Sequence, residues 1–152
     1  MNEPLVVVDT SIHVASEAFS KKGSPSREVI ARGAGNHFKF AVSELLLREI
    51  AEQLVGNGVD PELVAEYLAN LRVIASHFDD REDECVVCAD PDDVFVMVLA
   101  RTAEAWCIVS YDHALVDENA TPPGWSIGAF LLSLIHISEP TRLRRISYAV
   151  FC

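Results

Sequence analysis

The chain has 152 residues, of which 50% are hydrophobic and 23% charged, the length and composition of one globular domain with a real core. Its formal net charge of −11 excludes passive nucleic-acid binding through a basic surface, so a phosphate substrate would need a metal ion or a local basic patch. There is no bilayer-length apolar run, no signal-peptide order at the N-terminus and no disulfide-framework density among the four cysteines. We therefore expect a soluble cytoplasmic protein with no membrane partner.

The first predicted element is a strand at 5–8. Four apolar residues in a row, three of them β-branched, stop at Asp9, Thr10 and Ser11. A continuous apolar run is typical of a parallel strand covered by helices on both faces, and ligands bind beyond the carboxyl ends of such strands. Asp9 is therefore a candidate site residue. The alternative is that Asp9 merely caps the helix that follows, because Asp is a favoured N-cap.

Apolar periodicity and capping signals predict the elements of the middle of the chain. Helices are expected at 11–22, 26–32, 44–55 and from 60 to about 77, with Ser43 and Asp60 as caps, and a strand at 37–42. The acidic run at 79–84 is interpreted as a solvated loop. Asp90-Pro91-Asp92-Asp93 begins a helix that runs to about 104, and one of these three aspartates should act as its cap.

A second buried strand is predicted at 106–110. It again ends near a carboxylate, Asp112, which is expected to cap a short helix through Val116. A strand at 125–127 and a helix at 128–134 complete an α/β fold, a three-layer α/β/α sandwich with a mainly parallel central sheet. Residues 135–152 continue neither pattern and resemble translated sequencing-adaptor read-through. We therefore predict a domain at 1–134 and a non-native tail at 135–152.

Four carboxylates lie at the ends of predicted strands or on predicted helices near them: Asp9, Glu49, Asp93 and Asp112. Glu49 lies at the edge of an apolar helix stripe, where a carboxylate is awkward unless it faces a polar pocket; exposure to solvent is the alternative. An open α/β sheet brings its strand ends to one edge, where each pair of like charges at about 4 Å costs about 4 kcal/mol. Such a cluster must take up protons or hold a divalent cation. Mg²⁺ or Mn²⁺ prefers oxygen ligands and could activate water for phosphodiester hydrolysis.

At these residues the chain resembles the PIN-domain ribonucleases, the family that includes VapC-like toxins of bacterial and archaeal toxin–antitoxin pairs. Within a resemblance over about 5–134, the matching stretches are Val8–Ser11, Val42–Glu49, Cys88–Phe95 and Val109–Asp112. The sequence departs from the family pattern at Ser11, where many members have Asn, and at Ala114, where related members often carry a second acid.

The resemblance implies a PIN-like domain whose catalytic and metal-binding acids are Asp9, Glu49, Asp93 and Asp112. Asp90 and Asp92 are the alternative metal ligands should Asp93 not serve. Thr10, Ser11 and Ser110 are nearby hydroxyls that orient ligands or phosphate. The resemblance further implies an endoribonuclease dependent on Mg²⁺ or Mn²⁺, the toxin of a toxin–antitoxin pair, with an RNA substrate, an antitoxin protein as partner and a homodimeric state. The alternative is a catalytically silent PIN-like module that binds a protein or RNA without cutting it.

Other polar residues give weaker hypotheses. Cys85 and Cys88 form a lone C-x-x-C with no second pair, so zinc binding or thiol redox chemistry is a minor alternative. His13 and His113 are expected to be exposed at the starts of helices, with substrate contact as the alternative.

Overall fold

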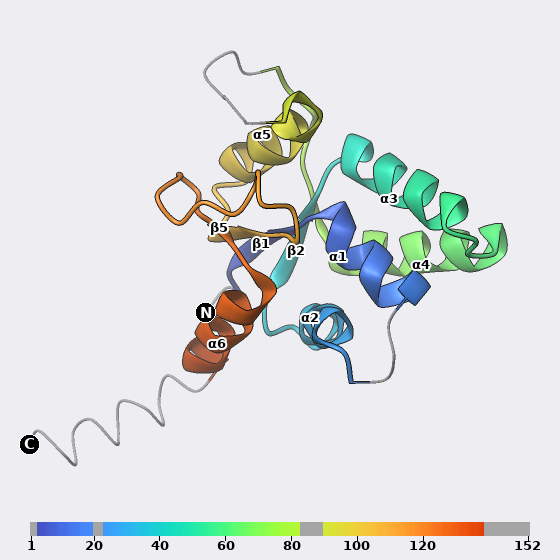
Figure 1. Ribbon diagram of the computed structural model, residues 1–152, viewed down its shortest axis with the longest axis horizontal. Helices are drawn as coiled ribbons and strands as arrows, with labels where there is room; N and C mark the ends of the chain where they lie inside the picture. The colour runs from blue at the N-terminus through green and yellow to red at the C-terminus, as the bar shows by residue number, and fades with distance from the viewer. Residues whose placement is uncertain (1–2, 20–22, 83–89, 139–152) are drawn as a thin grey trace, which may run out of the picture.

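A five-stranded parallel sheet forms the centre of the molecule. The computed structural model describes residues 3–19, 23–82 and 90–138 (Figure 1). The strands are β1 (Leu5–Val8), β2 (Lys39–Val42), β3 (Ser76–His77), β4 (Cys107–Val109) and β5 (Gly124–Trp125). Their spatial order is β3-β2-β1-β4-β5, and every pairing in the described part of the chain is parallel. The predicted α/β fold is confirmed.

Helices flank the sheet. They are α1 (Thr10–Val14), the π-helix η1 (Ala15–Phe19), α2 (Pro25–Ala34), α3 (Glu44–Gly56), α4 (Pro61–Ile74), the 3₁₀ helix η2 (Pro91–Asp93), α5 (Val94–Thr102) and α6 (Ile127–Ser138). In Figure 1, α5 lies on one side of the strands, while α2 and α6 lie on the other. The predicted caps hold two of these helices, since the Ser43 side chain accepts from the N–H of Leu46 and Asp60 accepts from that of Glu62.

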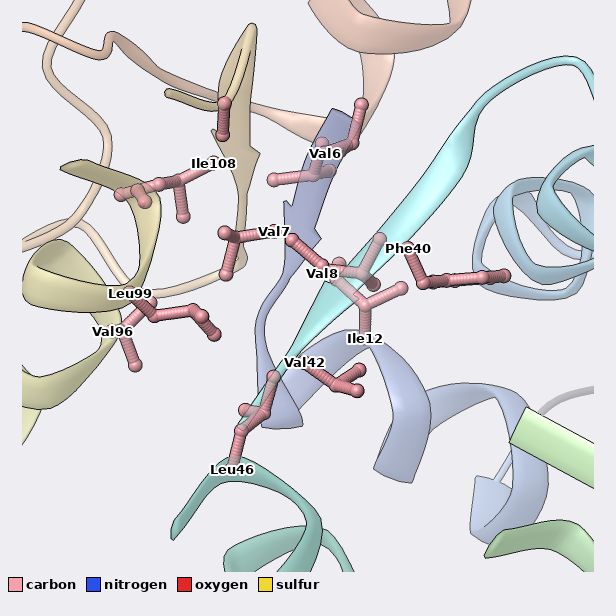
Figure 2. Packing of buried hydrophobic residues seen from close by; sticks show 14 of the residues in the cluster. Val6, Val7, Val8, Ile12, Phe40, Val42, Leu46, Val96, Leu99 and Ile108 are labelled. Atoms are coloured by element: carbon pink, nitrogen blue, oxygen red, sulfur yellow. The ribbon is translucent and has the colours of Figure 1, made fainter. Parts of the chain in front are cut away.

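The central strand β1 explains the continuous apolar run in the sequence. Val6, Val7 and Val8 are at most 1% exposed, because β1 is paired on both edges and covered on both faces. Figure 2 shows Val7 directed toward Leu99 of α5, whereas Val8 lies on the side of Ile12 of α1. Full burial of a valine side chain stabilises the fold by roughly 1.5–3 kcal/mol. The strand that leads to Asp9 is therefore anchored on every side.

Two helices predicted in the first half of the chain differ from the structure. The helix expected to run to 77 ends at Ile74, and the next residues form β3, which pairs with β2 through Ala41 and Ser76. Two residues are too few to show the period of a strand. The helix predicted at 11–22 becomes the short α1 followed by the π-helix η1.

The short helix predicted from Asp112 to Val116 is wrong. The chain forms turns there, with the N–H of Leu115 bonded to the carbonyl of Asp112 at 3.0 Å. The Gly124 N–H donates to the carbonyl of Asp117 at 2.9 Å, and a Cβ on Gly124 would lie only 1.6 Å from the Leu115 carbonyl oxygen. This segment is thus packed directly against β5, which favours a turn over a helical continuation.

The predicted domain boundary at 134 stays a prediction. Helix α6 continues to Ser138, four residues past that boundary, and 139–152 lie outside the described residues. Cys85 and Cys88 also lie outside them. Among the helices of the described ranges, none has the length and apolar character needed to cross a bilayer.

Close packing of α2 on the sheet depends on Gly33. A Cβ at this position would lie 2.2 Å from the Phe40 ring and 2.8 Å from the Phe38 ring. Both rings are 1% exposed and meet edge to face at 5.0 Å between centroids, so neither can easily move aside.

We therefore expect Gly33→Ala to destabilise the fold by about 1–3 kcal/mol, because it overpacks this aromatic contact. Thermal melting should show a fall in Tm of roughly 2–4 °C for each kcal/mol lost. Gly56→Ala is the matched control, since it also adds one methyl group to a helix but meets nothing within 4 Å. Equal melting temperatures for the two variants would contradict the packing argument.

Candidate functional site

The candidate site lies beyond the carboxyl ends of β1 and β4, the two strands between which the direction of winding reverses. From β1 the chain moves to β2 and β3 on one side, and it later returns to place β4 on the other. In open α/β sheets ligands bind at such a switch point. Asp9 follows β1 and its N–H donates to the carbonyl of Val109 at 2.9 Å, so the ends of the two strands are held together.

All four carboxylates predicted for the site line one open pocket of about 370 Å³. Asp9 comes from the end of β1, Glu49 from the second turn of α3, Asp93 from the junction of η2 and α5, and Asp112 from the loop after β4. The other lining residues are Thr10, Ser11, Val14, Ala15, Phe19 and Gln53. Three strand or helix ends and one helix face therefore bring together acids that are far apart in the sequence.

Two serine hydroxyls hold the Asp9 carboxylate. Ser110 Oγ donates to Asp9 Oδ2 at 2.8 Å, and Ser11 Oγ donates to the same oxygen at 3.0 Å. Each hydroxyl in turn accepts a backbone N–H, that of Asp112 for Ser110 and that of Tyr111 for Ser11. These backbone donors direct both hydroxyl protons toward Asp9. Ser11 thus holds the Asp9 carboxylate directly, although it departs from the family pattern noted in the sequence.

Asp9 is not simply a helix cap. It occupies the N-cap position of α1, but its side chain makes no capping hydrogen bond and is 6% exposed. The alternative raised by the sequence is therefore wrong. The Asp9 side chain is instead buried and oriented by two hydroxyl donors.

Asp93 and Asp112 form a close pair that Asp90 joins. One carboxylate oxygen from each of the three lies within 4.8 Å of the others. Asp90 is the aspartate that caps, since it accepts the N–H of Asp92 at 3.0 Å, whereas the Asp93 side chain makes no capping hydrogen bond. Asp92 is exposed and does not line the pocket.

The proton affinities of this pair are pushed in opposite directions. Burial, together with the hydrogen bond and charge of Asp112, raises the pKa of Asp93 from 3.8 to about 7. The hydrogen bond from Asp93 and the N–H of Ala114 lower the pKa of Asp112. Below about pH 7 the two carboxylates therefore share a proton that resides on Asp93.

Glu49 faces the pocket and is half-buried, so the alternative of simple solvent exposure is excluded. Burial and the charge of Asp9 raise its pKa, and the hydroxyl of Thr10 opposes this rise. Thr10 itself is 5% exposed and lines the pocket. The raised pKa therefore reflects first the burial of Glu49 and then its nearness to the Asp9 carboxylate.

The donor set fits a divalent cation. Every charged group lining the described pocket is a carboxylate, the ligand type that hard cations such as Mg²⁺ prefer. Asp93 Oδ2 is buried and has no hydrogen-bond partner among the described residues, although a buried carboxylate oxygen is normally satisfied. A cation beside Asp93 and Asp112 would satisfy this oxygen and replace the shared proton. The acidic cluster could therefore hold a metal.

Other predicted residues lie elsewhere. His13 was expected at the surface but is wholly buried, and burial lowers its pKa to about 4. Its Nδ1 bonds to the hydroxyl of Tyr67, so it joins α1 to α4. His113 is exposed, as expected, and Cys107 is a buried thiol whose pKa is raised by burial.

The sequence reasoning missed Gln53 and Phe19 as pocket residues. Gln53 follows Glu49 by four positions, so helical spacing places it on the same face of α3, and this signal could have identified it. No comparable signal existed for Phe19, because its position depends on the π-helical winding of η1.

Comparison with known proteins agrees with this architecture. A model of the PIN domain family matches residues 5–114, which include all four pocket carboxylates. No curated protein matches the chain. The PIN domain is a nuclease-like fold family whose members typically use divalent metals. By its matching sequence, its parallel sheet and its acidic pocket, the chain belongs to the PIN domain family.

Proposed function

We propose that the protein is a metal-dependent endoribonuclease that hydrolyses RNA phosphodiester bonds, with Asp9, Glu49, Asp93 and Asp112 as its catalytic and metal-binding acids. The observation that carries this proposal is the convergence of the four carboxylates on one pocket, where one buried oxygen of Asp93 has no hydrogen-bond partner within the described part of the chain. Mg²⁺ or Mn²⁺ is the proposed cofactor, and Asp90 is the reserve ligand because it lies within the same cluster.

Each acid has a distinct setting that supports a distinct role. The Ser11 and Ser110 hydroxyls fix one oxygen of Asp9, which orients the carboxylate before any ligand arrives. Asp93 and Asp112 each place a carboxylate oxygen within 4.8 Å of the other's. Glu49, whose pKa is raised, is suited to accept the proton that an attacking water loses. When bound, the cation supplies charge neutralisation at the phosphate and a lowered pKa of water.

Family resemblance supports a more specific biological role. We infer that the protein is the toxin of a toxin–antitoxin pair, that it acts on cellular RNA, that an antitoxin protein inhibits it, and that it forms a homodimer. The second candidate is a catalytically silent PIN-like module that binds protein or RNA. The observation that favours it is the acidic character of the pocket, whose described lining contains no lysine or arginine to hold a phosphate.

The first prediction concerns metal binding without substrate. Mn²⁺ should raise the Tm of the wild-type protein by several degrees, because a ligand at 100 times its Kd stabilises the native state by about 2.7 kcal/mol. Asp9→Asn should remove most of this rise, since the neutral amide has no negative charge and one oxygen fewer to offer a cation. Asp79→Asn is the matched control, because Asp79 is an exposed carboxylate outside the pocket. The silent module predicts no Mn²⁺ effect in any of the three proteins.

The second prediction concerns catalysis. Asp9→Asn should reduce cleavage of single-stranded RNA by about 100-fold or more, the order of loss expected when a group that orients the reacting centre is removed. Asp79→Asn should cleave like the wild type, and the loss of activity in Asp9→Asn purified in the same way would exclude a contaminating nuclease as its source. Undiminished cleavage by Asp9→Asn would contradict the proposed site.

The third prediction concerns pH. Asp93 holds its proton more tightly in the folded than in the unfolded state, so the stability that this proton contributes is complete below about pH 4 and is lost as pH rises through about 7. The metal-free wild type should therefore lose Tm across this range relative to Asp93→Asn, which cannot ionise. Melting curves recorded with chelator from pH 4 to 8 test this, and parallel profiles for the two proteins would refute a raised Asp93 pKa.

A further inference from the structure

The pocket has an apolar half that the proposed chemistry does not use. Val14, Ala15 and Phe19, from α1 and η1, line the same pocket as the four carboxylates, and Gln53 lines it from α3. Val14 and Ala15 are partly buried, whereas Phe19 is 68% exposed. The pocket therefore combines an acidic centre with an exposed aromatic ring and one amide group.

Phe19 does not serve the core. The packed cluster of hydrophobic residues in the described chain includes its neighbours Val14 and Ala18 but not Phe19 itself. It ends η1, a π-helix that runs from Ala15 to Phe19. π-Helical turns are rare and frequently occur at functional sites, because the wider winding redirects side chains away from the ordinary helical stripe. The exposed ring is thus placed at the pocket by a local departure from α-helical geometry.

Charge limits how this pocket can hold RNA. The described lining contains four carboxylates and no basic side chain, and the whole chain carries a net charge of −11. Apart from a bound cation, no charged group in the described lining attracts a phosphate, so a contribution that does not depend on phosphate charge would add to the affinity. Stacking of a base on an aromatic ring is such a contribution, and it tolerates every base because each has a π face.

We propose that Phe19 stacks on an unpaired nucleobase of single-stranded RNA, next to the phosphate that is cleaved at the carboxylates, and that the Gln53 amide contacts the edge of that base. This substrate class rests on the proposed ribonuclease function. Gln53 and Glu49 lie one helical turn apart on α3, so the base contact and the acidic centre are linked by a rigid element. A base in a duplex is already stacked and paired, so the site selects single strands.

Binding tests the proposal independently of cleavage. The probe is a short single-stranded RNA that contains a fluorescent adenine analogue, titrated with the full chain carrying Asp9→Asn to suppress cleavage. We expect the fluorescence to be quenched on binding. Adding Phe19→Ala should remove the quenching and raise Kd by roughly 5- to 150-fold, the range measured for loss of one stacked base. Phe19→Trp should restore both, because it keeps an aromatic face.

Matched controls and kinetics separate the outcomes. Leu132→Ala removes an equally exposed apolar side chain, on α6, and should change neither quenching nor Kd. In the otherwise wild-type chain, Phe19→Ala should raise KM for single-stranded RNA with little change in kcat. Unchanged Kd and KM in Phe19→Ala overturn the stacking proposal, even where wild-type cleavage upholds the ribonuclease. If the wild-type chain cuts no RNA but the quenching still depends on Phe19, the stacking site is supported and the proposed ribonuclease function is overturned.

Discussion

Repulsion among the pocket carboxylates is the interaction on which the site depends. Four acids face one cavity, and burial together with the charge of neighbouring carboxylates raises the pKa of Glu49 and of Asp93. Such an arrangement opposes folding, because each like-charged contact costs free energy in a partly buried place. It persists because the surrounding scaffold is rigid enough to impose it. A site strained in this way gains stability from any cation that it binds.

The scaffold supplies that rigidity through β1. This strand is buried on both faces and paired with β2 and β4, so the residue after it has almost no freedom to withdraw from the pocket. Asp9 is further fixed by hydroxyls from both sides, one on its own helix and one after β4. The packing of the hydrophobic core around β1 thereby fixes the position of the Asp9 carboxylate. A surface loop could not hold four like charges together in the same way.

Much of this arrangement could be predicted from local sequence. The apolar run before Asp9 identified a buried parallel strand, and Ser43 and Asp60 were correctly identified as caps, because these signals involve only neighbouring residues. The wholly buried position of His13 could not be predicted, because its partner Tyr67 lies 54 positions away. β3 was missed because two residues carry no period, and the π-helical η1 was missed because sequence periodicity assumes α-helical winding. Gln53 was missed although its spacing from Glu49 could have revealed it.

The distance in sequence between the site residues has a consequence for the timing of biosynthesis. Asp9 and Ser110 are separated by 101 positions, and Asp112 follows two residues later. A chain that is still emerging from the ribosome and has not yet passed β4 holds Asp9 without the Ser110 hydroxyl and without Asp112. The pocket is completed only when β4 has been synthesised and has paired with β1. Whatever chemistry the pocket performs thus begins only after the loop that follows β4 has been synthesised, and a truncated translation product that stops before β4 lacks the complete pocket.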